Sequence, residues 1–382
     1  MRLPIYLDFN ATTPVDPAVL AEMLPYLFDR FGNPSSAHLY GNEAQEAVVR
    51  ARTRVGELLG AHPDEIIFTG GGSESDNLAI KGVAFANRDR GRHIITSSVE
   101  HPAVLKSCRY LSEEHGFKIT YLNVDRSGKV DPDEVRRAIA PDTILITIMH
   151  ANNEVGTLQP VAQIGAIARE HGIPFHTDAA QSVGKIPARV SELNVDLLTV
   201  AGHKLYAPKG IGALFVRRGT RLHSLIHGAG HERGLRAGTE NVPYIVGLGK
   251  ACDIAGQRLP QEEIRMTGLR DRLHQALVQR IEGLVLNGHP AERLPNTLNV
   301  SFPGVPGYEL LSAVPEVAAS TGSACHSGTP EPSPVLLAMG VPEAVAVGAV
   351  RLSLGRWTTE GQVDRAAELL ASAAAASRGQ SG

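Results

Sequence analysis

The chain has 382 residues, 43% of them hydrophobic, and its formal net charge is −3 with no long run of one sign. This length allows a large core and a second, smaller domain, while the balanced charge argues against nucleic acid or an anionic membrane as the main partner. No apolar stretch suggests a signal peptide or a membrane span, and three cysteines make no disulfide framework, so we expect a cytoplasmic protein.

Short apolar runs rich in β-branched residues alternate with helix-like stretches as far as Val216. They predict seven strands, at Ile66–Thr69, His93–Ser97, Lys118–Leu122, Thr143–Met149, Ile173–Thr177, Val195–Val200 and Ile211–Val216. Helices are expected between them, including Ser73–Asn87, Asp131–Ala140 and Pro160–His171. This alternation predicts an α/β fold, with an open, mostly parallel sheet and helices on both faces. Only ten residues separate the last two runs, which favours an antiparallel pair there.

The pattern changes after Tyr244. The elements expected there are a long helical region from Pro243 to about Ile281 with a break at Pro260, a strand at Asn296–Phe302, a small-residue loop at Ala318–Pro334, a helix from Thr359, and a frayed tail at Ala371–Gly382. We place a domain boundary near Ala255. Residues 15–255 are then a large domain, and residues 1–14 and 256–382 form a smaller α+β domain that carries the loop.

Polar residues follow five of the predicted strands. In order along the chain they are Gly70-Gly71-Gly72-Ser73-Glu74, Glu100-His101-Pro102, Asn152-Asn153-Glu154, Asp178-Ala179-Ala180-Gln181 and Gly202-His203-Lys204. Open α/β sheets bind their ligands beyond the carboxyl ends of the strands. The convergence of glycines, carboxylates, amides, histidines and a lysine on one edge therefore predicts a functional site there.

Two of these groups have both a structural and a functional interpretation. Gly70–Ser73 is either a plain turn capped by Ser73 or a phosphate cradle of backbone N–H groups and the Ser73 hydroxyl. It matches neither a Walker loop nor a dinucleotide fingerprint. Asp178 either caps the next turn or pairs with a cationic pyridinium nitrogen, because an unpaired buried carboxylate costs several kcal/mol. Such a pair keeps the ring protonated as an electron sink.

Lys204 and His101 also have two interpretations each. Lys204 is either an ordinary surface lysine or, between two apolar strands, a desolvated lysine whose pKa is lowered. A lowered pKa is what covalent attachment to a carbonyl cofactor requires. His101 is either a hydrogen-bonded loop histidine or a residue that stacks on a cofactor ring and helps to move protons.

Cys325 lies in Ser320–Gly328, a run of small residues that predicts an exposed, mobile segment. An exposed thiol in such a loop is placed to attack a substrate and then move away. Cys108 and Cys252 lie in helix-like stretches, where free cysteines are usually buried and inert.

A metal site is the competing interpretation of the 15 histidines. The candidate ligand pairs are His227 with His231 and Cys325 with His326. No Cys-x-x-Cys or His-Glu-x-x-His spacing supports either pair, so we expect no metal.

These motifs, in this order, resemble the cysteine desulfurases of the NifS/IscS type, pyridoxal 5′-phosphate (PLP) enzymes of the class V aminotransferase group. The resemblance covers nearly the whole chain. Its matching stretches are Tyr6-Leu7-Asp8 with Asn10–Pro14, Gly32–Ser36, Phe68–Asn77, Glu100–Val104, Asn152–Thr157, His176–Gln181, Gly202–Lys204, Arg236–Asn241, Gly322–Cys325 and Arg351–Arg356.

The resemblance implies PLP fold type I, a homodimer, and conversion of L-cysteine to L-alanine. The sulfur would pass to Cys325 as a persulfide for an acceptor or scaffold protein, in the synthesis of iron–sulfur clusters or other sulfur-containing biomolecules. The implied cofactor-binding residues are Gly72, Ser73, His101, Asn153, Asp178, Gln181, His203, Lys204 and Thr239 of the partner subunit. The implied catalytic residues are Lys204, Cys325 and His101, and the implied substrate-binding residues are Asn33 and Arg351.

Within that set the resemblance also assigns roles. Lys204 holds the cofactor covalently, His101 stacks on its ring, and Asp178 pairs with the ring nitrogen. Gln181 pairs with the phenolic oxygen, and Asn153 lines the ring site. The phosphate is held by Ser73, His203 and Thr239 of the partner subunit. Arg351 grips the substrate carboxylate, with Asn33 nearby.

Two departures from the family pattern bear on function. Ala201 stands where the family usually has a serine, which removes one phosphate hydroxyl and about 1 kcal/mol of cofactor binding. Cys325-His326-Ser327 and Ser333–Leu337 look like the selenocysteine lyases of animals. The alternatives are therefore a selenocysteine lyase, another class V reaction such as transamination, or a module that mainly docks a scaffold or sulfur carrier.

Overall fold

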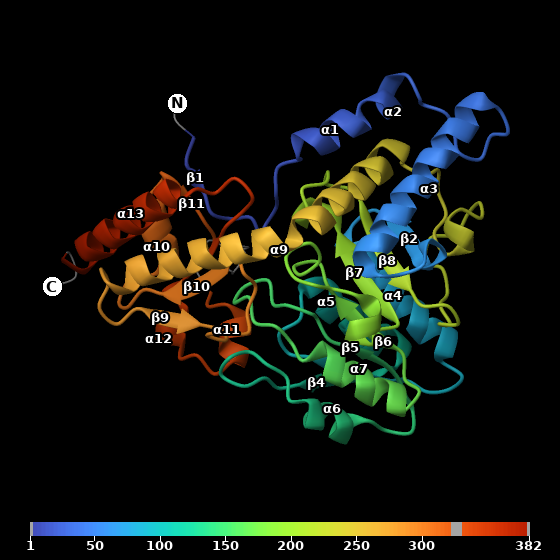
Figure 1. The fold of residues 1–382 in the computed structure, drawn as a ribbon. Helices are drawn as coiled ribbons and strands as arrows, with labels where there is room; N and C mark the ends of the chain where they lie inside the picture. Colours follow the sequence, from blue (N-terminus) through green and yellow to red (C-terminus); the bar gives the residue numbers. More distant parts are fainter. Residues whose placement is uncertain (1–2, 322–330, 380–382) are drawn as a thin grey trace.

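A computed structural model describes residues 3–321 and 331–379 of the chain. Its larger part is built around a seven-stranded sheet in the order β2-β8-β7-β6-β5-β3-β4 (Figure 1). The strands are β2 (Ile66–Thr69), β3 (His93–Ser97), β4 (Lys118–Leu122), β5 (Thr143–Thr147), β6 (Phe175–Asp178), β7 (Leu197–Ala201) and β8 (Gly212–Val216). β8 runs antiparallel to both neighbours, and the other pairs are parallel. The seven predicted strands and the antiparallel pair are confirmed.

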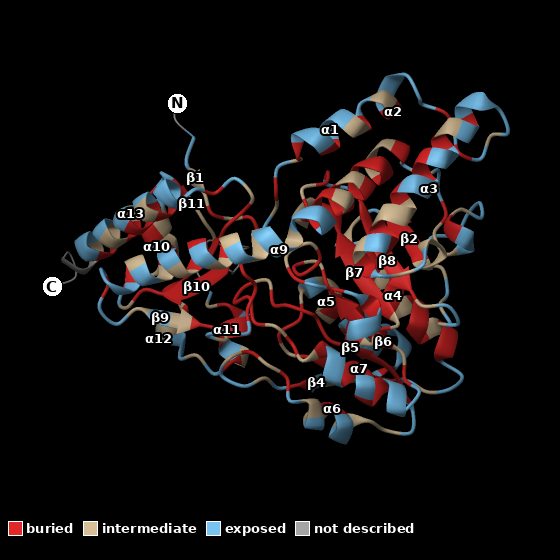
Figure 2. Ribbon diagram, in the orientation of Figure 1, coloured by how far each residue is buried: buried red, intermediate tan, exposed pale blue. Residues whose placement is uncertain are grey.

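Helices cover both faces of this sheet, and Figure 2 shows them buried toward the sheet and exposed outward. They are α3 (Leu39–Leu59), α4 (Gly72–Asn87), α5 (Pro102–His115), α6 (Pro132–Ala138), α7 (Val161–Glu170), the short α8 (Val190–Leu193) and the first part of α9 (Val242–Val278), with α1 (Pro17–Met23) and α2 (Pro25–Phe28) at one side. Because successive strand residues face opposite sides, Ile66 and Phe68 join the cluster under α3, α7 and α9. Ile67 joins the cluster under α4 and α5.

The smaller part has its own core. It contains a three-stranded antiparallel sheet and the two-stranded pair β1-β11, which pack with the C-terminal helix against the second half of α9 (Figure 1). Its elements are β1 (Ile5–Tyr6), β9 (Val285–Asn287), β10 (Thr297–Ser301), β11 (Val317–Ala318), β12 (Ala349–Ser353), α10 (Gly307–Ser312), α11 (Pro334–Ala338), α12 (Glu343–Ala346) and α13 (Glu360–Gly379). Separate hydrophobic clusters on either side of about residue 255 support the two-domain division, which stays a prediction.

Two expectations from the sequence are wrong. α9 continues without a break through Pro260, which lies exposed inside the helix. A proline there costs about 3 kcal/mol in lost hydrogen bonding and crowding. We attribute its tolerance to packing, because Val246 anchors one end of α9 in the larger core and Leu273 anchors the other in the smaller one. The tail is also helical as far as Gly379, because Ala374 is buried against the smaller core.

The remaining outcomes concern the cysteines and the membrane. Cys108 and Cys252 are buried, and burial raises the pKa of each thiol to about 12, which disfavours the reactive thiolate. Among the described residues, none of the helices is long and apolar enough to cross a membrane. The expected cytoplasmic location stays a prediction.

Candidate active site

A cavity of about 620 Å³ lies where the predicted strand ends meet. It collects loops after β2, β3, β5, β6 and β7, the N-terminal residues 10–12, and one residue of β12. The site residues predicted from the sequence that line it are Gly72, Ser73, His101, Asn153, Asp178, Gln181, His203, Lys204 and Arg351. Asn33 and Thr239 are exposed and do not line this cavity. Cys325 lies outside the described residues.

Lys204 ends a short 3₁₀ turn (Gly202–Lys204) that follows β7. Its Nζ donates to the carbonyl oxygens of Asn10 and Ala11, the second at 2.7 Å. Burial, and then the charge of Arg351, lowers the pKa of Lys204 from 10.5 to about 8. A substantial fraction of this amine is therefore neutral near physiological pH, as a nucleophile toward a carbonyl must be.

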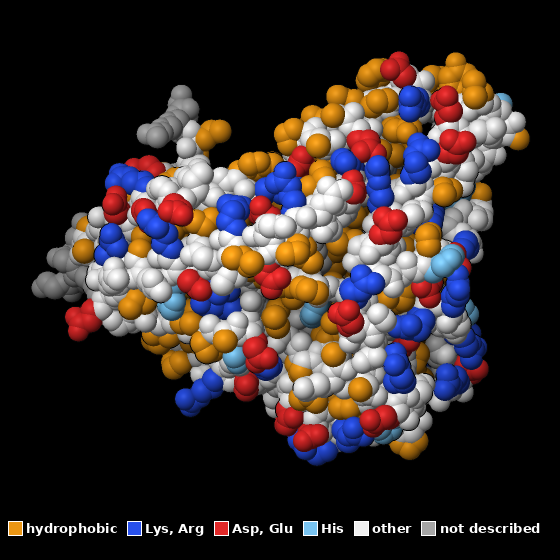
Figure 3. Space-filling view, in the orientation of Figure 1, with side chains coloured by type: hydrophobic (Ala, Val, Ile, Leu, Met, Phe, Trp, Pro, Cys, Tyr) orange, Lys and Arg blue, Asp and Glu red, His pale blue; other side chains and the backbone are white. Residues whose placement is uncertain are grey.

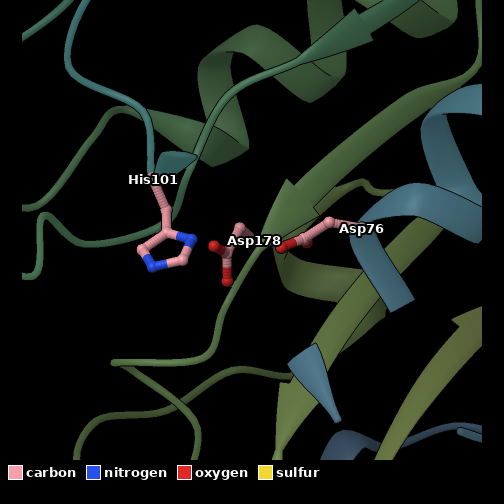
Figure 4. A group of neighbouring side chains, drawn as sticks. All are labelled: Asp76, His101 and Asp178. Atoms are coloured by element: carbon pink, nitrogen blue, oxygen red, sulfur yellow. The ribbon is translucent and has the colours of Figure 1, made fainter. Parts of the chain in front are cut away.

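Asp178 lies between His101 and Asp76, and each of the three offers one atom within 4.8 Å of the others (Figure 4). Asp178 ends β6, and its Oδ1 accepts the N–H of Ala180 at 2.9 Å. It therefore both caps the following turn and lines the cavity. His101 precedes α5, where its Nδ1 accepts the N–H of Ala103 at 3.2 Å, so a neutral ring carries its proton on Nε2.

Burial raises the pKa of both carboxyl groups, and the charge of Asp178 raises that of Asp76 further. Oδ1 of Asp76 is also buried without a hydrogen-bond partner. The pair therefore favours one negative charge, which a cationic ring nitrogen beside Asp178 would stabilise. A metal ion needs deprotonated ligands, so the raised pKa values of Asp76 and Asp178 disfavour metal binding by these three residues.

The end of the cavity formed by the start of α4 has the properties of a phosphate site. α4 begins at Gly72 after Gly71, whose φ is 147°, and no side chain caps its first N–H groups. Ser73 lies in the first turn and is not the N-cap, so the interpretation of a plain turn capped by Ser73 is wrong. Free N–H groups at the start of a 16-residue helix favour an anion.

His203 and Ala201 complete this end. The Nδ1 of His203 is 3.2 Å from the Thr12 hydroxyl oxygen, and burial followed by the charge of Lys204 lowers the pKa of His203 to about 4. A neutral His203 remains a hydrogen-bond donor. A Cβ on Gly72 would lie 3.1 Å from the Ala201 methyl, so Ala201 directly borders the proposed phosphate position. A lysine, a buried carboxylate and an open helix start in one cavity fit PLP.

Arg351 projects from β12 of the smaller part into this cavity. Its Nη2 donates to Oδ1 of Asp8 at 2.8 Å and its Nη1 donates to the Asn153 carbonyl at 3.0 Å. Its Nε is buried without a partner. The guanidinium is therefore fixed in place and retains a donor for a further acceptor, such as a carboxylate.

Both described flanks of the predicted cysteine loop are attached beside the cavity. Ser320 exchanges two backbone hydrogen bonds with Arg351, at 2.7 and 3.3 Å. On the other side Ser333 caps α11 and donates to the Glu154 carboxylate, next to Asn153 in the chain. Both anchors therefore tie the ends of the loop to residues at the cavity wall.

Several residues around the site were not predicted from their chemistry. Asn10 and Asp76 line the cavity, and Asp8 pairs with Arg351. Asp76 lies one helical turn after Ser73, so helical spacing could have indicated it. Asp8 and Asn10 belong to the N-terminal stretch. No local sequence pattern indicates that this stretch lies beside both sheets.

Comparisons with known proteins agree with this geometry. The family Aminotransferase class-V matches residues 5–366. A curated relative, the cysteine desulfurase IscS of Methanosarcina thermophila, is 52% identical over 368 residues, 96% of this chain and 91% of the relative. A solved NifS-like protein has a TM-score of 0.91 at 40% identity, over 97% of this chain and 99% of that one. The structure of SspA in complex with cysteine has a TM-score of 0.82 at 43% identity, over 93% and 99%. The resemblance and the fold type inferred from the sequence are confirmed.

Gly212→Ala tests the proposed phosphate end. A Cβ on Gly212 would lie 2.7 Å from the carbonyl carbon of Gly71 and 2.6 Å from the Val200 oxygen, so the start of α4 must shift. We expect an overpacking cost of about 1–3 kcal/mol and about tenfold weaker cofactor retention. The measurement is PLP absorbance per protein after dialysis. Gly361→Ala, with nothing within 4 Å, is the control, and equal retention in both variants would contradict the placement.

Proposed function

Because the chain belongs to the class V aminotransferase family, we propose that it is a PLP-dependent cysteine desulfurase that passes the sulfur of L-cysteine to Cys325 and releases L-alanine. One observation carries this proposal. A lysine with a lowered pKa, a buried carboxylate, an open helix start and an arginine with a free donor share one cavity. Each matches one group of PLP or of an amino acid: the carbonyl, the ring nitrogen, the phosphate and the substrate carboxylate.

When bound, PLP supplies an electron sink for the bonds at the substrate Cα. The protein provides placement and proton transfer. Arg351 holds the substrate carboxylate, which orients the Cα hydrogen, and neutral Nζ of Lys204 takes that proton. Asp178 would stabilise a positive charge on the ring nitrogen, and His101, whose ring lies near Asp178, offers its Nε2–H.

Cys325 is the residue that accepts the sulfur. Its Sγ, as the thiolate, attacks the substrate sulfur; an S–S bond forms as the C–S bond breaks, and the bonding electrons pass to the substrate side, which takes up protons. The balance is L-cysteine plus Cys325 thiol to L-alanine plus Cys325 persulfide. Ser320 and Ser333, which flank the loop that contains Cys325, are hydrogen-bonded beside the cavity. An acceptor protein would then receive the persulfide sulfur, for iron–sulfur cluster or other sulfur-containing products.

We also propose that a second copy of the chain completes the site. Figure 3 shows hydrophobic side chains gathered along α1 and α2. This apolar surface consists of Leu20, Leu24, Leu27, Phe28, Phe31, Leu39 and Tyr40, each more than 40% exposed. Asn33 lies in the loop between Phe31 and Leu39 of this surface, and Oγ of Ser35 in the same loop lies 3.5 Å from Nε2 of His231, in the segment leading to Thr239. Asn33 and Thr239, which resemble site residues, miss the cavity of their own chain and so remain available to a partner.

The reaction of Lys204 with PLP should depend on pH with a midpoint near 8. The pKa of Lys204 is lowered, so its neutral fraction reaches one half near pH 8 and falls below it. We expect the rate at which apoprotein recombines with PLP to rise with pH and level off above 8, measured as borohydride-fixed absorbance. Lys204→Ala should fix no PLP. A midpoint near 10.5, as for an exposed lysine, would contradict the assignment.

Cys325→Ser should abolish sulfide and alanine production from L-cysteine, by at least about a hundredfold, and leave the PLP absorbance intact. The matched control is Cys108→Ser, which changes a buried thiol and should retain desulfurase activity. Turnover of L-selenocysteine by the same variant, compared by kcat/KM with that of L-cysteine, shows which chalcogen the wild type prefers. Full desulfurase activity in Cys325→Ser would refute the role of Cys325.

Phe28→Asp should shift the protein from dimer to monomer in sedimentation and lower its desulfurase activity at the same concentration. A charge in a desolvated apolar interface is costly, so the partner surface is lost. Ile264→Asp, at a 76% exposed site on α9 outside the apolar surface, is the control and should remain dimeric. A wild type that is monomeric and fully active would contradict the proposal of a shared site.

A further inference from the structure

Lys185 is a polar group next to this site, in contact with two of its residues, and neither the sequence motifs nor the mechanism assigns it a role. It lies in the turn after β6, four residues beyond Gln181. Its Nζ donates to Oε1 of Gln181 at 2.8 Å and to Oδ1 of Asn10 at 3.1 Å. Both recorded partners are amides, so no carboxylate compensates for bringing this amine inside. Lys185 and Lys204 also line a small second cavity, which shares Lys204 with the first one.

These contacts determine which way the Gln181 amide points. An ammonium group has only donors, and even a neutral amine has two hydrogens for its two acceptors here. The Gln181 atom beside Lys185 must therefore be the oxygen. Its Nε2 is then turned the other way, where it donates to the Asn10 carbonyl at 2.9 Å. That carbonyl also accepts from Nζ of Lys204, so Gln181 lies one hydrogen-bonded group away from the reactive lysine.

The Asn10 side chain is fixed in the same way. Its Oδ1 accepts from Lys185 and from Nδ2 of Asn296 at 3.1 Å. Its Nδ2 donates to the Asn153 carbonyl at 3.2 Å and to the Thr297 hydroxyl at 2.9 Å. Both amides beside Lys204 thus have their oxygen atoms toward Lys185. Loss of the Lys185 donors would leave one buried acceptor on each amide without this partner.

Electrostatics supports a positioning role over a catalytic one. Burial, then the charges of Lys204 and Arg351, lowers the pKa of Lys185 well below its usual value. Among the described residues, Nζ of Lys185 makes no hydrogen bond to a carboxylate or a thiol. It donates to the amide oxygens of Asn10 and Gln181. It acts through the groups it orients.

We propose that Lys185 is a positioning residue that locks the Gln181 amide with its NH₂ toward the cofactor side, where it donates to the phenolic oxygen of PLP. This inference rests on the proposed function, because it needs PLP in the cavity. A donor at the phenolic oxygen stabilises its anionic form. Without the lock, the amide can rotate and the protonated form of the bound cofactor persists to higher pH.

Lys185→Met tests this directly, since methionine fills a similar volume without donors. We expect the pH midpoint of the bound-cofactor absorbance change to rise by about one unit. Lys185→Arg, which keeps donors, should restore most of the wild-type midpoint. In a Gln181→Leu background, Lys185→Met should cause no further shift, because the amide it orients is gone. The melting temperature of each apoprotein is measured in parallel, since a purely structural role changes that temperature without moving the midpoint.

An unchanged midpoint in Lys185→Met, or a full additional shift in the Gln181→Leu background, overturns the proposal. If Lys185→Met does not fold, Lys185→Leu, which also lacks donors, replaces it and must raise the midpoint in the same direction. A wild-type protein that shows no absorbance of bound PLP would instead refute the proposed function. Failure of the proposed function and failure of the Lys185 proposal are therefore distinguishable.

Discussion

The buried carboxylate of Asp178 is the constraint on which the site depends. Burial at the end of β6 raises its pKa, and its charge raises the pKa of the neighbouring Asp76, so ionisation of both carboxyl groups together is disfavoured. At the other end of the cavity the start of α4 presents uncapped N–H groups that favour an anion. The protein alone leaves both ends electrostatically incomplete. A ligand with a cationic ring nitrogen and a phosphate would complete both, and Lys204 lines the same cavity.

The same burial that raises the carboxyl pKa values lowers those of the bases. The pKa of Lys204 is lowered to about 8 and the pKa of His203 to about 4. The neutral forms of both groups are therefore available as hydrogen-bond donors or nucleophiles. Burial therefore shifts the pKa values of Asp76, His101, Asp178, His203 and Lys204 toward the neutral form of each group. The chemistry of the site follows from how few charges this environment permits.

The larger sheet, its antiparallel pair and the convergence of the strand ends could be predicted from the sequence because hydrophobic period and strand-end position are local signals. The uninterrupted α9 could not, because Pro260 indicates a break locally, whereas packing at both ends of the helix decides the outcome. The helical tail was missed for a similar reason, since Ala374 gains its burial only from the smaller core. The contacts of Asp8 with Arg351 join residues 343 positions apart. No pattern within a window of a few residues contains that information.

The N-terminal stretch explains why the site needs both parts of the chain. Leu7 is buried in the smaller core, while Asn10, three residues later, accepts from Gln181 and Lys204 of the larger part through its carbonyl. Its side chain simultaneously binds Thr297 and Asn296 beside β10. Any relative shift of the two cores would break hydrogen bonds around Asn10 and also move Arg351 relative to Lys204. The hydrogen bonds of Asn10 therefore align the group that holds the substrate with the group that takes its proton, which is the alignment that proton transfer at Cα requires.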